Sequence, residues 1–232
     1  LYKNKLTDAG VDSLLNALTA RSSLTELDLR GNAISLALLP AAHFSLSLQT
    51  LQLGGNPLSA HSLEPVSALI RNSERLTALN LRATKLSAVG VKQLACAIAE
   101  CKRCALRSLN IQANPIGDDG AESLAAALRA VKLDTLFLGK CEIAERGAKH
   151  LASILADERC SLSFLNLRGN PLADGGCAAL ASGLSANRSL TALFLNKCKI
   201  GSEGAAALSH ALAGNSTLET LILFDNPLGD GK

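Results

Sequence analysis

The stretch "LNLRGNPL" at residues 165–172 combines a strand signal with a turn signal. Leu165 and Leu167 alternate with polar residues, so both should point to the same side of a short β-strand. Asn170 follows where the chain has to turn, and its side-chain amide can bond backbone groups that the turn leaves unpaired. The stretch therefore predicts a strand that buries its leucines and ends at an asparagine.

Copies of this stretch recur along the whole chain. The pattern L-x-x-L-x-L-x-x-(N/C/T)-x-(L/I) begins at Leu24, Leu48, Leu76, Leu106, Leu133, Leu162, Leu190 and Leu218. Successive copies start 24, 28, 30, 27, 29, 28 and 28 residues apart, and a clipped copy, "LYKNKL", opens the chain. A nearly constant period of this length predicts a solenoid, in which each repeat buries its apolar side against its neighbours.

The ninth motif position, held by Asn170 in the quoted stretch, carries a small polar residue in every repeat. We expect a ladder of asparagines there, formed by Asn32, Asn56, Asn114, Asn170 and Asn226. Thr84, Cys141 and Cys198 take the same position, and from Thr84 onward asparagine alternates with these other residues. The alternation indicates two types of repeat, and it gives the two cysteines a structural role.

Segments between the motifs predict helices. Residues 120–130, 147–157 and 204–214 show leucines three or four positions apart with alanines between them, which is an amphipathic helix period. We expect N-caps at Asp8, Asp118, Asp174 and Ser202, and we expect the glycines two residues later to let neighbouring helices approach closely. The repeats starting at Leu24 and Leu48 carry Pro40 and Pro65, so their convex segments should be irregular or short.

Repeats of about 28 residues with full helices and an alternating ninth position resemble leucine-rich repeat proteins of the ribonuclease-inhibitor-like class. They are also similar to the repeat regions of NOD-like receptors. The resemblance covers the whole chain and implies an α/β leucine-rich repeat solenoid, a horseshoe with parallel strands on its concave face and helices on its convex face. We therefore expect one domain over residues 1–232, with about eight repeats and a clipped first one, as a fragment of a longer protein whose open ends could stack on another copy.

The third, fifth and seventh motif residues should face the concave side of this horseshoe. Four of the five phenylalanines fall on these positions, all in the last four repeats. A contiguous apolar patch with a basic rim usually marks a contact site. The predicted partner-binding residues are Phe137, Phe164, Phe194, Ile222 and Phe224, with Lys140, Arg168 and Lys197 at their border. The same rings could instead only cover one another across the strands, or a C-terminal part of the longer protein could cover them.

Composition excludes several other functions. The net charge is +3, no apolar run reaches the length of a membrane span, and the histidines do not pair with a nucleophile or a carboxylate at catalytic spacing. Seven cysteines without a regular framework indicate reduced thiols of a cytoplasmic protein, and the single CxxC pair, Cys101 and Cys104, is weak support for a metal. We therefore expect neither an enzyme nor a cofactor or metal site.

Three classes of function remain. The leading hypothesis is a protein-recognition module that binds a partner on its concave face, as the resemblance to the sensing or autoinhibitory repeats of NOD-like innate immune receptors implies. A GTPase-activating protein of the Ran GTPase-activating type has similar repeats and is an alternative. RNA binding is a less favoured alternative, because Arg30, Arg82 and Arg168 share the seventh position but Glu26 and Asp28 offset them.

Overall fold

The computed structural model describes residues 1–17, 23–36, 47–58 and 63–229. One eight-stranded sheet runs through it in the order β1 to β8, and every neighbouring pair is parallel. The strands are β1 (Glu26–Asp28), β2 (Thr50–Gln52), β3 (Ala78–Asn80), β4 (Ser108–Asn110), β5 (Thr135–Phe137), β6 (Phe164–Asn166), β7 (Ala192–Phe194) and β8 (Thr220–Ile222).

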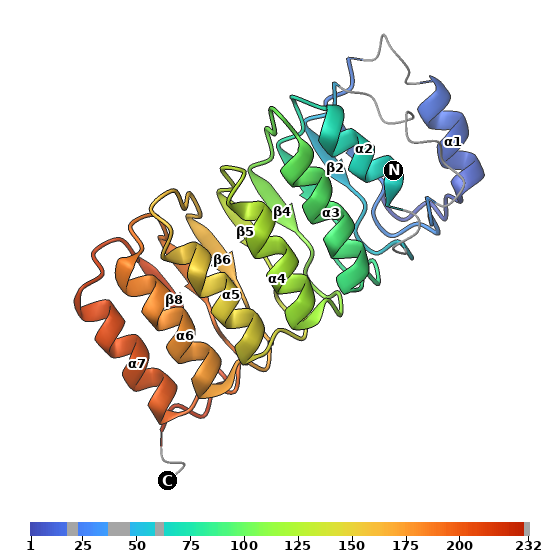
Figure 1. Ribbon diagram of the computed structural model, residues 1–232. Coiled ribbons are helices and arrows are strands. Elements are labelled where there is room, and N and C mark those ends of the chain that lie inside the picture. Colours follow the sequence, from blue (N-terminus) through green and yellow to red (C-terminus); the bar gives the residue numbers. More distant parts are fainter. Residues whose placement is uncertain (18–22, 37–46, 59–62, 230–232) are drawn as a thin grey trace.

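Helices follow the strands along the chain, and all but the first of them pack side by side on one face of this sheet (Figure 1). They are α1 (Asp8–Ala17), α2 (Glu64–Asn72), α3 (Ala88–Glu100), α4 (Gly117–Leu128), α5 (Glu145–Leu155), α6 (Ala173–Ala186) and α7 (Ser202–Ala213). The two ends of the chain lie at opposite ends of the array (Figure 1). This arrangement confirms the predicted α/β solenoid with parallel strands on one face and helices on the other.

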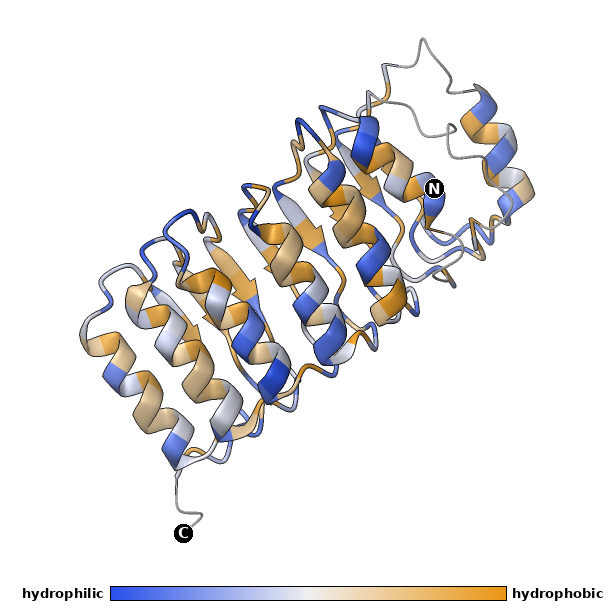
Figure 2. Cartoon of the chain, in the orientation of Figure 1, coloured by the Kyte–Doolittle hydropathy of each residue, from blue (hydrophilic) through white to orange (hydrophobic). Residues whose placement is uncertain are grey.

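The core is a continuous layer of leucines between the sheet and the helices. In β2 to β7 the central leucine of each strand is buried and its two neighbours are half-buried, which confirms the predicted alternation. Figure 2 shows orange hydrophobic segments next to paler and blue ones on both the strands and the helices. The side chains beside each central leucine therefore lie on the opposite face of the sheet, which is the face predicted to be concave and is called the concave face below.

The asparagine ladder at the ninth position is confirmed. Asn170 donates its side-chain amide to the carbonyls of Leu138 and Leu167, at 2.8 and 2.6 Å. Its Oδ1 accepts the backbone N–H groups of Cys141 and Ile143, at 2.9 and 3.1 Å. One buried side chain thus joins two consecutive repeats. Asn226 and Asn114 make equivalent bonds to the repeats before them.

The aspartates predicted as N-caps have a different role. Helices α4 and α6 begin before Asp118 and Asp174, and neither helix has a side-chain cap bond, so the capping prediction is wrong for both. Ser202 is the first residue of α7 and not its N-cap. Gly201 holds the N-cap position, and no side chain caps the helix there. Asp8 is the first residue of α1. The helices start earlier than the sequence suggests, which leaves the aspartates in the first turn, where a negative charge is favoured.

From the first turn, each aspartate bonds the backbone of the following repeat. Oδ1 of Asp174 accepts N–H groups from Gly201 and Gly204, at 2.7 and 2.8 Å. Asp118 accepts from Ala144 at 2.8 Å, and Asp8 accepts from Ser35 and Leu36 at 2.7 and 3.0 Å. A Cβ on Gly204 would lie only 2.7 Å from Oδ1 of Asp174, which confirms that glycine here allows close approach.

We expect Asp174→Ala to lower the free energy of unfolding by about 2 kcal/mol, because two part-buried N–H groups lose their acceptor. Asp174→Asn keeps an oxygen at this position and should lower it by less than half as much. Chemical denaturation of the two variants and the parent measures the difference. Equal stability of Asp174→Ala and the parent would contradict the role in joining repeats.

The first two complete repeats were expected to have irregular or short convex segments, and the structure agrees for the second of them. Helix α2 has nine residues, against 11 to 14 in α3 to α7, and Pro65 lies in its first turn, where a proline is tolerated. The expectation for Pro40 lies outside the described residues. The regular part of the array therefore extends from β3 to β8, and the predicted binding residues all lie within it.

Candidate binding surface

Three of the predicted phenylalanines form one row of rings across neighbouring strands. The ring centroids of Phe137 and Phe164 are 4.9 Å apart, and those of Phe164 and Phe194 are 5.0 Å apart. Phe164 holds the third motif position of β6, whereas Phe137 and Phe194 hold the fifth position of β5 and β7, so the rings alternate along the row. Tilted pairs at this separation add stability beyond their buried area.

Apolar side chains continue the row toward the C-terminal end. Ile222 of β8 lies directly opposite Phe194 in the strand register. Phe224 follows at the seventh motif position and is 57% exposed, whereas the other three rings are half-buried. We call Phe137, Phe164, Phe194, Ile222 and Phe224 the aromatic surface. Its inner rings contact one another, and Phe224 lies in the repeat of β8, the edge strand of the sheet.

The three predicted cationic residues follow the strands of the aromatic surface. Lys140 and Lys197 are exposed and have positive φ angles of 55° and 59°, in the tight turns after β5 and β7. Nζ of Lys197 lies 3.4 Å from a carboxylate oxygen of Asp225. Arg168 is half-buried, and its backbone N–H donates to Oδ1 of Asn166 at 3.0 Å. All eight predicted residues lie on strands β5 to β8 or within three residues after them, and contacts among them are seen for Phe137, Phe164 and Phe194.

Two buried donors on this face have no acceptor. Nε of Arg168 and Nδ2 of Asn196 are covered by protein atoms, and neither makes a hydrogen bond within the described part of the chain. An unpaired buried donor costs about 1–3 kcal/mol. Asn196 is only 1% exposed, although its motif position predicted a surface residue. Sequence patterns assign it to the concave face but do not reveal its burial or its missing partner.

The N-terminal half of the same face is polar and hollow. Arg30 pairs with Asp28 at 2.7 Å, and the guanidinium lowers the pKa of that carboxyl. The Tyr2 ring lies 5.3 Å from the Arg30 guanidinium, a cation–π contact that the sequence analysis did not predict. A hollow of about 460 Å³ is bordered by Tyr2, Lys3, Arg30, Gly54, Asn80 and Arg82, among others. It lacks the apolar side chains that characterise the other half.

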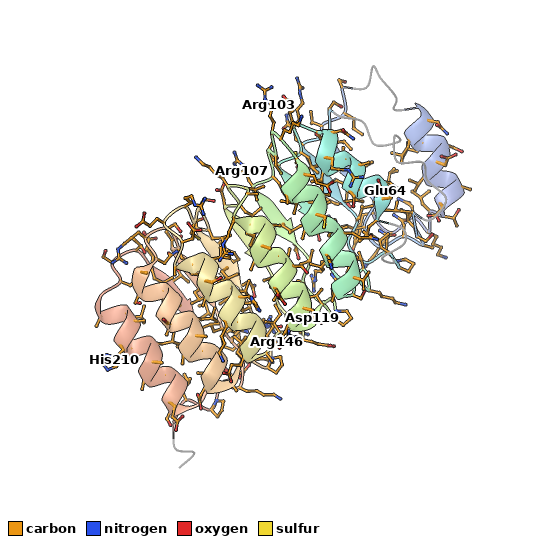
Figure 3. All side chains as sticks on the ribbon, viewed as in Figure 1. Glu64, Arg103, Arg107, Asp119, Arg146 and His210 are labelled. Atoms are coloured by element: carbon orange, nitrogen blue, oxygen red, sulfur yellow. The ribbon has the colours of Figure 1, made fainter. Side chains whose placement is uncertain are left out.

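Charges on the convex face, in contrast, pair between neighbouring helices. Arg146 of α5 forms an ion pair with Asp119 of α4, and Figure 3 shows the two side chains next to each other. Arg146 also lies 3.7 Å from Asp118. Arg71 of α2 pairs with Glu64 of the same helix and with Glu100 of α3. Cations on this face are therefore largely neutralised by the fold itself.

Two of the buried thiols are poor nucleophiles. All seven cysteines lie within the described residues and are free. Burial raises the pKa of Cys141 and of Cys177 to about 12, so both are neutral thiols near pH 7. Among the described residues, no group of three or more histidine, cysteine or acidic side chains could hold a metal ion. None of the helices in that part of the chain is long and apolar enough to cross a membrane.

Comparisons with known proteins agree with this architecture. A family model described as a leucine-rich repeat matches residues 22–36, 104–125, 159–181, 186–209 and 214–231. Ribonuclease inhibitor from Sus scrofa is 34% identical over 239 residues, which cover 99% of this chain and 52% of the inhibitor. NACHT, LRR and PYD domains-containing protein 3 from Rattus norvegicus is 29% identical over 202 residues, covering 84% of this chain and 19% of that protein.

A solved structure shows the same fold. The crystal structure of the mouse RP105/MD-1 complex contains a chain that superposes with a TM-score of 0.55 at 19% identity, covering 97% of this chain and 38% of that chain. The present chain spans about half the length of the ribonuclease inhibitor that it matches and about a fifth of the NACHT protein.

Proposed function

Because the chain is a leucine-rich repeat protein of the ribonuclease-inhibitor-like class, we propose that it is a protein-recognition module that binds its partner through the aromatic surface. The leucine-rich repeat fold is a protein-binding scaffold, and the mouse RP105/MD-1 structure, which has the same fold, is itself a complex. The observation that carries the proposal is the row of Phe137, Phe164 and Phe194, half-buried rings on the face of the sheet opposite the helices, with centroids 4.9 and 5.0 Å apart. Exposed aromatic side chains beside cations are the residue types that dominate binding energies at protein interfaces.

We further propose that this recognition takes place in the cytoplasm, in the repeat region of a NOD-like innate immune receptor. Similarity to the rat NACHT protein over 84% of this chain supports that assignment, although ribonuclease inhibitor is similar over nearly the whole chain as well. The seven free thiols suit a reducing compartment. RNA binding and GTPase activation remain the alternatives. Aromatic side chains beside cations are also the residue types on which RNA bases stack, whereas no feature of the aromatic surface favours GTPase activation.

We expect Phe224→Ala to weaken partner binding at least tenfold while the unfolding temperature stays within about 1 °C of the parent's, because the ring is exposed. The measurement has two stages. Immobilised parent and variant first capture proteins from a cell lysate at low and high salt, and a partner retained only by the parent is then purified and titrated against both.

Two further variants show whether a loss of binding is specific to the aromatic surface. Val89→Ala removes an apolar side chain that is 62% exposed on α3, on the other face, and should leave binding unchanged. The double variant Phe137→Ala/Phe194→Ala should weaken partner binding and also lower the unfolding temperature, because both rings contact Phe164. Unchanged capture by Phe224→Ala would contradict the proposal. Binding that disappears at high salt for every variant would instead support RNA.

A further inference from the structure

The two unpaired donors of the concave face are neighbours. Arg168 and Asn196 hold the same motif position after adjacent strands, and the backbone N–H of Gly169 donates to the carbonyl of Asn196 at 2.9 Å. Equivalent residues of paired strands lie about 4.8 Å apart. Buried donors in native proteins nearly always have a partner, so two neighbouring exceptions beside the aromatic surface indicate an acceptor that binding supplies.

Charge around the donors indicates that this acceptor is an anion. Lys140 is exposed, and its backbone N–H donates to the carbonyl of Arg168 at 2.7 Å, so it belongs to the adjacent turn. Neither Lys140 nor Arg168 has an ion-pair partner in the described part of the chain, unlike Arg146 on the convex face. Of the three cations, only Lys197 is offset, by Asp225.

The next strand provides an apolar neighbour. Phe224 holds the motif position of Arg168 and Asn196 one repeat later, and its carbonyl accepts the backbone N–H of Lys197 at 3.2 Å. Ile222 lies two residues earlier and faces Phe194. A ligand over this region therefore meets donors and a positive charge on one side and apolar side chains on the other.

We propose that Arg168 and Asn196 together bind a carboxylate of the partner protein, on a segment in which an acidic residue adjoins a bulky apolar one. The inference rests on the proposed function, because it names the chemistry of the partner at the aromatic surface. One carboxylate has two oxygens and can accept a bond from Nε of Arg168 and another from Nδ2 of Asn196. Protein atoms cover both donors in the free chain, so neighbouring side chains shift as the carboxylate enters.

The test uses two short peptides, acetylated and amidated, of sequences ELEFE and QLQFQ. In ¹H–¹⁵N spectra of the chain, we expect ELEFE to shift the side-chain amide of Asn196 and the Nε–H of Arg168, with a dissociation constant on the order of 1 mM. QLQFQ should bind at least tenfold more weakly, because hydrogen bonds to a charged acceptor are the stronger ones. Equal shifts with the two peptides, or no shift at either side chain, would overturn the proposal.

Arg168→Gln and Asn196→Ala should each weaken ELEFE binding at least fivefold. Asn196→Ala should leave the unfolding temperature unchanged or raise it, since it removes a donor that has no acceptor; a purely structural role would lower it. Arg82→Gln is the matched control, because Arg82 holds the same motif position after β3, and its variant should bind ELEFE like the parent. If Arg82→Gln loses as much affinity for ELEFE as Arg168→Gln does, the effect is one of net charge only, and the proposed site is wrong.

Two other anions complete the experiment. Inorganic phosphate and oligouridylate at the concentration of ELEFE should shift the two side chains less than the peptide does. Larger shifts with oligouridylate would identify a nucleic-acid surface and overturn the proposal. If Phe224→Ala loses the purified partner while Arg168→Gln and Asn196→Ala keep it, the proposed function stands and the carboxylate site fails.

Discussion

Asn170→Ala is expected to lower the free energy of unfolding by about 4 kcal/mol, near the upper end for a single substitution. The side chain makes four hydrogen bonds to backbone groups, and three of these groups, in Leu138, Cys141 and Ile143, belong to the preceding repeat. Alanine would leave these buried groups without partners, and each would lose a bond that water cannot replace. Chemical denaturation followed by circular dichroism measures the change.

The alternating ninth position provides the control. Cys141 occupies it one repeat earlier, and its thiol makes only weak bonds, to the carbonyls of Ile111 at 3.3 Å and Gly139 at 3.6 Å. Cys141→Ala should therefore lower stability by about 1 kcal/mol, since a sulfur donor is weak and little volume is lost. If both variants lose the same stability, the ladder does not distinguish the two types of repeat, and the alternation has another cause.

Sequence periodicity was sufficient to predict the fold because every repeat buries the same motif positions against its neighbours. The position of Leu165 within its motif determines that it is buried, whatever the neighbouring repeats contain. The same periodicity placed Phe137, Phe164 and Phe194 on one face, since strand register follows from the motif. Repeat position alone therefore predicts which side of the sheet a residue occupies.

Interactions between repeats were the part that the sequence did not reveal. Asp174 looks like a helix cap in its own repeat, and only the stacked structure shows that it bonds Gly201 and Gly204 of the next one. Asn196 looks like a surface residue because its motif position faces outward, but it is 1% exposed. Burial at that position depends on the sizes and rotamers of side chains in the adjacent repeats, which a single motif does not encode.

Gly183→Ala is the second large effect, and we expect it to lower the free energy of unfolding by about 3 kcal/mol. Gly183 lies within α6, where glycine is normally about 1 kcal/mol worse than alanine, so propensity alone predicts stabilisation. A Cβ there would lie 2.5 Å from the carbonyl oxygen of Ala152 and 3.0 Å from its Cα, both backbone atoms of α5. Backbone cannot rotate away as a side chain can, so the two helices have to separate.

Gly214→Ala is the matched control for this effect, because a Cβ at Gly214 meets nothing within 4 Å and its φ of −110° suits alanine. It should leave stability unchanged or raise it slightly. The separation should also reach the concave face, since α5 and α6 follow the strands that carry Phe137 and Phe164. A nuclear Overhauser contact between these two rings, 4.9 Å apart in the parent, should weaken in Gly183→Ala and persist in Gly214→Ala. A stable Gly183→Ala variant that keeps this contact would mean that the stacked helices tolerate a change in spacing, and that the aromatic surface does not depend on their close approach.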